Sequence, residues 1–111
     1  MRNLNSILLE GSVASNPSPD RSGYVTFQLA VKAHHQIGDK VQDITEYFPI
    51  AVADPALCRK TLLMSQGTAI RLVGRLINLH DIEPPNLPFH PSVAVCAEHI
   101  ELLHGLGDSR P

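Results

Sequence analysis

One stretch of the chain, Thr45 to Leu76, constrains the fold more than any other because it combines a strand, a capped helix and a second strand. Its centre holds Asp54 and Pro55, a helix-start signal: an Asp side chain caps free amides, and a proline at the first position has no N–H to lose. We expect the helix to span 56–66, with Gly67 as its left-handed stop. One short helix therefore interrupts a chain that otherwise reads as strands.

Hydrophobic periodicity predicts five strands. They lie at 4–13, 24–33, 46–53, 68–79 and 92–103. In the first strand Leu4 and Leu8 fall on the face opposite Ile7 and Leu9. The strand therefore has apolar residues on both faces, and another surface must bury the second set. In the third strand, Phe48, Ile50 and Val52 share one face, which leaves Tyr47 on the other.

Polar and proline-rich segments connect these strands. The stretch His34 to Asp43 is polar with Gly38 at its centre, which predicts a hairpin loop. The segment 81–91 contains prolines that forbid a regular ladder. We expect one all-β domain with one short helix over 1–104, followed by a short flexible tail at 105–111.

Composition excludes several classes of protein. The 111 residues suffice for one domain, and no apolar run is long enough to span a bilayer. The N-terminal residues lack a secretory signal, so we expect a cytoplasmic protein. The spacing of Cys58 and Cys96 is not that of a metal site, so we expect both to be buried free thiols. No nucleophile elbow, phosphate loop or metal-binding motif is present, so we expect no enzyme, cofactor or metal.

The distribution of charge is more informative than its sum of −2. No Asp or Glu lies between Pro55 and His80, a stretch that contains Arg59, Lys60, Arg71 and Arg75. These side chains could form a basic zone suited to phosphates, or they could be ordinary solvated residues.

The triplet Thr45-Glu46-Tyr47, with NSILLEGSV, FQLAVKA and CAEHIELL around it, resembles the bacterial single-stranded DNA-binding proteins over almost the whole chain. The resemblance implies a five-stranded OB-fold barrel, base stacking on Tyr47 and assembly through the first strand. His35 aligns with another stacking position. The chain departs from the family in having no Trp and in replacing a basic, aromatic hairpin with the segment 81–91. Because replicative members of the family carry a long tail, the short end implies either a trimmed DNA-binding domain or a tailless paralogue similar to primosomal replication protein N.

Together these features predict a homo-oligomer, dimer or tetramer, that binds single-stranded DNA in replication, recombination or repair. The residues predicted to contact DNA are Tyr47, Lys32, His35, Lys40, Arg71 and Arg75, and those predicted at the subunit interface are Leu4, Ser6, Leu8 and Phe48. The pair His34 and His35 could stack on bases, carry a pH-dependent charge, ligate a metal, or be plain loop residues; the spacing of the other histidines supplies no recognised ligand set. An alternative stays open: an OB-fold interaction module that contacts another protein, such as a replication or repair protein, with DNA binding weak or lost.

Overall fold

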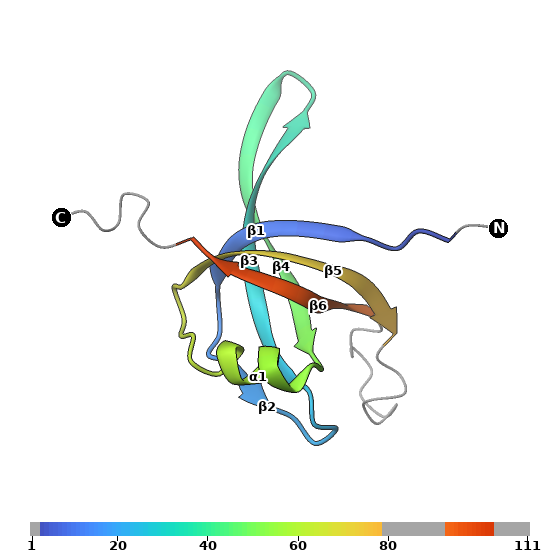
Figure 1. Cartoon of the computed structure of the whole chain (residues 1–111). Helices are drawn as coiled ribbons and strands as arrows, with labels where there is room; N and C mark the ends of the chain where they lie inside the picture. Colours follow the sequence, from blue (N-terminus) through green and yellow to red (C-terminus); the bar gives the residue numbers. More distant parts are fainter. Residues whose placement is uncertain (1–2, 79–92, 104–111) are drawn as a thin grey trace.

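The computed structural model describes residues 3–78 and 93–103 (Figure 1). The elements in chain order are β1 (Ile7–Val13), β2 (Ser18–Pro19), β3 (Val25–Ile37), β4 (Lys40–Val52), α1 (Pro55–Thr61), β5 (Ala69–Asn78) and β6 (Val93–Leu102). Each of the five predicted strands corresponds to one of the five long strands. The predicted proline-rich segment 81–91 and tail 105–111 lie outside the described residues.

The strands form a closed barrel. Their order in the sheet is β1-β5-β6-β4-β3-β2, and β1 also pairs with β3, which closes the five long strands into a barrel. The joining pairs are Ser12 with Ala30 and Val13 with Leu29. Only the β4–β6 contact is parallel among the described strand pairs, and it involves just Ile50 to Val52. A five-stranded barrel with one helix between its β4 and β5 strands is an OB-fold, as the sequence predicts.

The core fills the barrel with the inward rows of its strands. Its buried members are Val13, Val25, Phe27, Leu29, Ile50, Val52, Met64, Ile70, Leu72, Val95, Ala97 and Ile100. Ile7, Leu9 and Phe48 pack against this cluster, and Leu8 and Tyr47 are exposed. The predicted alternation in the first and third strands is therefore confirmed.

The helix begins as predicted but ends early. The Asp54 carboxylate accepts a hydrogen bond from the Leu57 N–H at 2.9 Å, so Asp54 is the N-cap. The helix ends at Thr61, whose hydroxyl donates to the Leu57 carbonyl at 2.7 Å. The prediction of a helix to residue 66 with Gly67 as its stop was wrong, because the chain turns to bury Met64. Gly67 has a positive φ of 97°, but its N–H donates to the Val13 carbonyl of β1.

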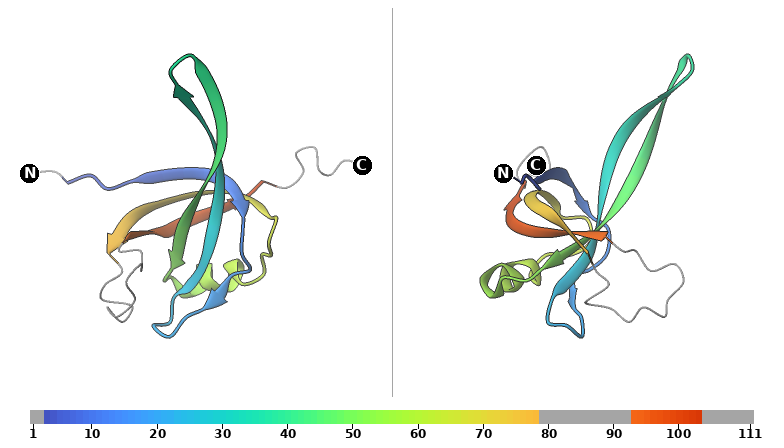
Figure 2. Two further views of the ribbon diagram at one scale, coloured as in Figure 1. Left: turned by 180° about the vertical axis from the view of Figure 1, so that it is seen from behind. Right: turned by 90° about the vertical axis from the view of Figure 1, so that its right-hand side faces the viewer.

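The predicted loop from His34 to Asp43 was also wrong. β3 and β4 pair without interruption from Val25–Val52 to Ile37–Lys40, and only Gly38 and Asp39 remain for the turn. Gly38 has a φ of 62°, which suits the first central position of a tight hairpin turn. The end of this hairpin projects from the barrel as a two-stranded arm, residues 30–48, whose base packs against the core through Val31 and Phe48 (Figures 1 and 2).

Candidate nucleic-acid interface

The pleat gives the arm two different faces. The Tyr47 face carries the even-numbered residues of β3 and the odd-numbered residues of β4, and the Phe48 face carries the others. On the Tyr47 face lie Ala30, Lys32, His34, Gln36, Val41, Asp43, Thr45 and Tyr47; on the Phe48 face lie Val31, Ala33, His35, Ile37, Lys40, Gln42, Ile44, Glu46 and Phe48. Between residues 31 and 49 the described part of the chain offers these two strands no third partner.

Tyr47 presents its ring to solvent. The residue is 61% exposed, and its directly paired neighbour on β3 is Ala30, whose methyl group is too small to cover the ring. An exposed aromatic ring on a sheet is suited to stacking on a nucleic-acid base, and every base offers a face for it. Tyr47 therefore lies where the sequence places it, on the outside of the third strand of the barrel.

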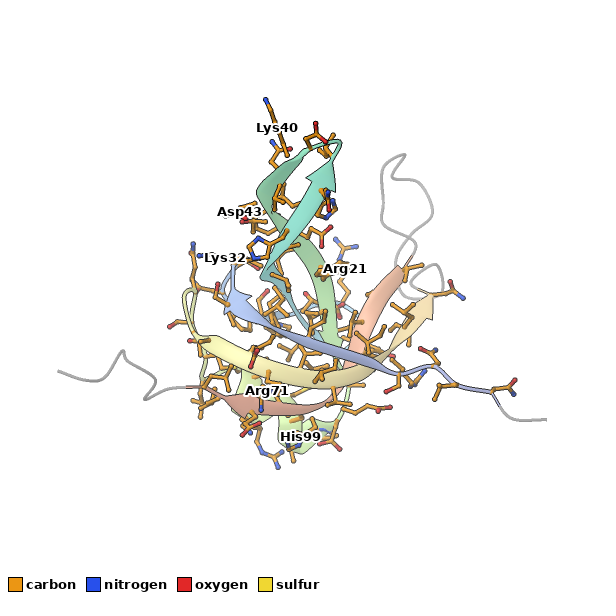
Figure 3. All side chains as sticks on the ribbon, turned by 90° about the horizontal axis from the view of Figure 1, so that it is seen from above. Arg21, Lys32, Lys40, Asp43, Arg71 and His99 are labelled. Atoms are coloured by element: carbon orange, nitrogen blue, oxygen red, sulfur yellow. The ribbon has the colours of Figure 1, made fainter. Side chains whose placement is uncertain are left out.

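Lys32 lies on the same face as Tyr47. It pairs with Thr45, and this pair lies two residues along the strands from the Ala30–Tyr47 pair. Two residues along a strand correspond to about 7 Å, so the ammonium group of Lys32 can reach a phosphate next to a base stacked on Tyr47. Figure 3 shows Lys32 on the arm near the barrel, with Lys40 at the far end. Of the other five residues predicted to contact DNA, Lys32 is the one that shares the face of Tyr47.

His35 and Lys40 lie on the Phe48 face. The His35 Nε2 is 3.4 Å from a carboxylate oxygen of Glu46. Lys40 is paired with Ile37 beside the turn. Neither side chain shares the surface of Tyr47, which the alternation within a continuous strand explains. If residues 34–43 formed an irregular loop, the alternation would not determine on which side these two side chains lie.

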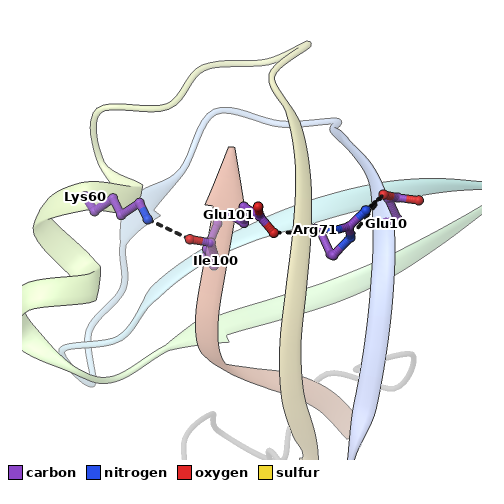
Figure 4. A network of polar contacts seen from close by, with 5 residues as sticks. All are labelled: Glu10, Lys60, Arg71, Ile100 and Glu101. Atoms are coloured by element: carbon purple, nitrogen blue, oxygen red, sulfur yellow. Dashed lines mark hydrogen bonds and ion pairs between the residues drawn. The ribbon is translucent and has the colours of Figure 1, made fainter. Parts of the chain in front are cut away.

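Arg71 is held by two carboxylates on the outer surface of β5. Its guanidinium lies 2.8 Å from Glu10 on β1 and 3.3 Å from Glu101 on β6 (Figure 4). The hydrogen bond that Arg71 donates to Glu10, with the attraction of both acids, raises the pKa of Arg71. These contacts join three adjacent strands.

Two other basic residues of the acid-free stretch, Arg75 and Lys60, are also engaged. Arg75 lies 3.4 Å from Glu98 on β6, and the ammonium group of Lys60 donates to the Ile100 carbonyl at 2.6 Å. Together with the pairing of Arg71, this places three glutamates beside two arginines on β1, β5 and β6. The two arginines of β5 therefore do not form a free basic surface, because acids from distant positions in the sequence pair with them.

The residues predicted at the subunit interface lie on different parts of the molecule. Leu8 is 67% exposed and Leu4 is 92% exposed, with Ser6 exposed between them. Phe48 packs against the core instead. On the side away from β5, β1 pairs with β3 only at Ser12 and Val13, so its edge over 7–11 has no partner among the described strands.

The two cysteines and the metal-ligating side chains were the remaining candidates for chemistry. Cys96 is a buried free thiol, as predicted, and Cys58 is a half-buried one. Burial raises the pKa of the Cys96 thiol, and the nearby Arg75 offsets part of that rise. Within 3–78 and 93–103, no cluster of three metal-ligating side chains occurs. No helix in those ranges has the length and apolar content required to cross a membrane.

Comparison with known proteins supports the fold. No family model and no curated protein matches the sequence. Among solved structures, the chain is similar to the Plasmodium falciparum SSB in complex with single-stranded DNA, with a TM-score of 0.71, 18% identity and coverage of 93% of this chain and 97% of that one.

Two bacterial structures are similar as well. The small single-stranded DNA-binding protein of Streptomyces coelicolor has a TM-score of 0.62 at 22% identity and covers 92% of this chain and 95% of its own. PriB of Ralstonia solanacearum has a TM-score of 0.65 at 13% identity, with coverage of 92% and 100%. The chain shares the OB-fold of SSB proteins and PriB.

Proposed function

We propose that this protein binds single-stranded DNA through the Tyr47 face of the arm, without strong sequence preference. One observation carries the proposal. The exposed ring of Tyr47 and the side chain of Lys32 lie on the same face of the arm, and their residue pairs are two residues apart along the strands. The fold supports it, because similar structures include an SSB bound to single-stranded DNA. We place the protein in DNA replication, recombination or repair in the cytoplasm, as a binding protein and not an enzyme.

The proposed binding follows from two kinds of contact. A base stacks on Tyr47, which contributes about 1–3 kcal/mol and tolerates any base. Lys32 pairs with the neighbouring phosphate and releases a counterion, so the affinity falls as salt rises. Neither contact reads base edges, which accounts for the lack of sequence preference.

The other predicted contacts would play smaller parts. Lys40, beside the turn, would meet a strand that passes over the end of the arm, whereas His35, on the Phe48 face and paired with Glu46, would lie away from that strand. Arg71 and Arg75 would have to exchange a carboxylate for a phosphate, which removes most of the electrostatic gain. We therefore expect Lys32 to contribute more to the salt dependence than either arginine.

We propose that two copies of the chain associate through β1. The unpaired edge over 7–11 and the exposed Leu4 and Leu8 are liabilities that a second copy would cover. Burying two leucines in each subunit contributes about 3–6 kcal/mol before entropy losses. The variant Leu8→Asp should shift the protein toward a monomer in sedimentation equilibrium, whereas a wild-type monomer at micromolar concentration would contradict this part of the proposal.

The direct test is a fluorescence anisotropy titration of labelled oligo-dT across a salt series, with a labelled duplex of the same length as comparison. We expect saturable binding of the oligo-dT that weakens with salt and exceeds binding of the duplex. Equal affinity for both would indicate a nonspecific polyanion effect, and no binding would refute the function.

A second candidate function is a protein-interaction module. The network of Glu10, Arg71 and Glu101 favours it, because two carboxylates around one guanidinium offer little to DNA but can pair with charges on a partner protein. Oligomerisation without binding of oligo-dT would favour this alternative.

A further inference from the structure

A second ring lies on the Tyr47 face. His34 is paired across the hairpin with Asp43, and its Nδ1 lies 2.5 Å from a carboxylate oxygen of that residue. Both side chains are accessible, at 76% and 81% exposed. With Lys32 and Thr45, they line a shallow depression of about 210 Å³ on the arm.

The three groups follow one another along the face. Tyr47 is paired with Ala30, Lys32 lies two residues further along β3, and His34 lies two residues beyond Lys32. Each step corresponds to about 7 Å along a strand. A DNA strand that begins on Tyr47 and follows the arm past Lys32 therefore reaches His34 next.

We propose that His34 is a phosphate-contacting residue of this site when its imidazole is protonated, and that Asp43 orients the ring. Binding of single-stranded DNA is then stronger in mild acid. The inference rests on the proposed function, and it adds a contact and a form of regulation to the same site.

The charges on the arm give the direction of the effect. The Tyr47 face carries Lys32 and Asp43, whose charges cancel, so it becomes net positive only when His34 gains a proton. The Phe48 face carries Lys40 and Glu46 with His35, and Asp39 lies in the turn. Protonation of His35 therefore adds charge on the side of the arm away from Tyr47.

The pair His34–Asp43 is not needed to hold the arm together. An ion pair as exposed as this one contributes little to stability. Variants at His34 should therefore fold, and a change in DNA affinity can be attributed to the lost ring.

The chain provides a matched control in His35, which lies on the same strand and also pairs with a carboxylate, but on the other face. The experiment measures the affinity for labelled oligo-dT from about pH 5 to 8, the range in which histidine changes charge, with circular dichroism at each pH. The proteins compared are wild type, His34→Asn and His35→Asn.

We expect wild type and His35→Asn to bind roughly two- to fivefold more tightly at the acid end, the size of one exposed ion pair. His34→Asn should lose this gain. In a further variant, Asp43→Asn, affinity at the alkaline end should rise because a repulsive carboxylate has been removed.

Each other outcome has a definite meaning. An equal pH response in the two histidine variants would overturn the role of His34 and leave Tyr47 and Lys32 as the site. A pH-independent affinity of the wild type would do the same. If the wild type binds no oligo-dT at any pH, the proposed function itself fails.

Discussion

Replacing Gly11 with Ala tests how the barrel closes. A Cβ atom at this position would stand 2.1 Å from the Ala30 carbonyl oxygen and 3.2 Å from a methyl carbon of Val31. The first of these contacts is with backbone, so no side-chain rotation relieves it. β1 and β3 would have to move apart where they join.

The expected cost can be worked from the contacts at that junction. The strands meet in two residue pairs, Ser12–Ala30 and Val13–Leu29, and the Ala14 N–H donates to the Gln28 carbonyl at 2.8 Å. Overpacking of a tight site costs about 1–3 kcal/mol, and we take the upper end because the clash is with backbone. Alanine recovers about 0.5–1 kcal/mol of chain entropy. We expect Gly11→Ala to lower the free energy of unfolding by roughly 2 kcal/mol.

Urea denaturation of the two proteins, followed by circular dichroism, measures this difference. The control is Gly23→Ala, which adds the same methyl group where no atom lies within 4 Å, at a φ of 94°. Its cost should be smaller, about 1 kcal/mol, because only the left-handed backbone is strained. If Gly11→Ala unfolds at the same urea concentration as wild type, the close approach of β1 to β3 is wrong.

Three further predictions follow from single contacts. Asp54→Ala should lower stability by about 1 kcal/mol in thermal unfolding through loss of the helix cap; an unchanged midpoint would mean that the cap contributes nothing. Iodoacetamide at mild alkaline pH should modify Cys58 before Cys96, because burial blocks access to Cys96 and keeps its thiol protonated; the reverse order in mass spectrometry would contradict that burial. In the salt series, Lys32→Gln should reduce the slope by up to about 0.7, whereas Arg71→Gln should change it less, and the opposite ranking would show that Arg71 meets phosphate.

The sequence predicts the barrel well because apolar residues alternate along strands such as the barrel part of β3. Val25, Phe27 and Leu29 are buried where the period of two places them, and Asp54 caps the helix as its pairing with Pro55 indicates. These are local signals, and local chemistry decides them. The resemblance to single-stranded DNA-binding proteins implies, in addition, that these strands join into an OB-fold barrel.

The errors arise where contacts over long sequence distances decide. The helix ends at Thr61 because Met64 enters the core, which no local signal announces. The acids that engage Arg71 are Glu10 and Glu101, each on a different strand. Both effects depend on how the strands are placed in the barrel.

The arm is different, because its signal was present in the sequence. Gly38-Asp39 is a two-residue hairpin pair, and it predicts continuous strands on either side where polarity suggested a loop. Extending the alternation through it would have separated His34 from His35 and placed His34 with Tyr47. Polar residues on both faces masked the pattern, since neither face of the arm is buried there.

Central to this account is the base contact of Tyr47. Titrating labelled oligo-dT with wild type, Tyr47→Phe and Tyr47→Ala tests it most directly, because Phe keeps the ring and Ala removes it. We predict that Tyr47→Phe binds like wild type and that Tyr47→Ala, still folded, loses about 1–3 kcal/mol of binding free energy, or roughly 5- to 150-fold in Kd. Equal affinities for all three proteins would contradict the claim that this face of the arm holds single-stranded DNA.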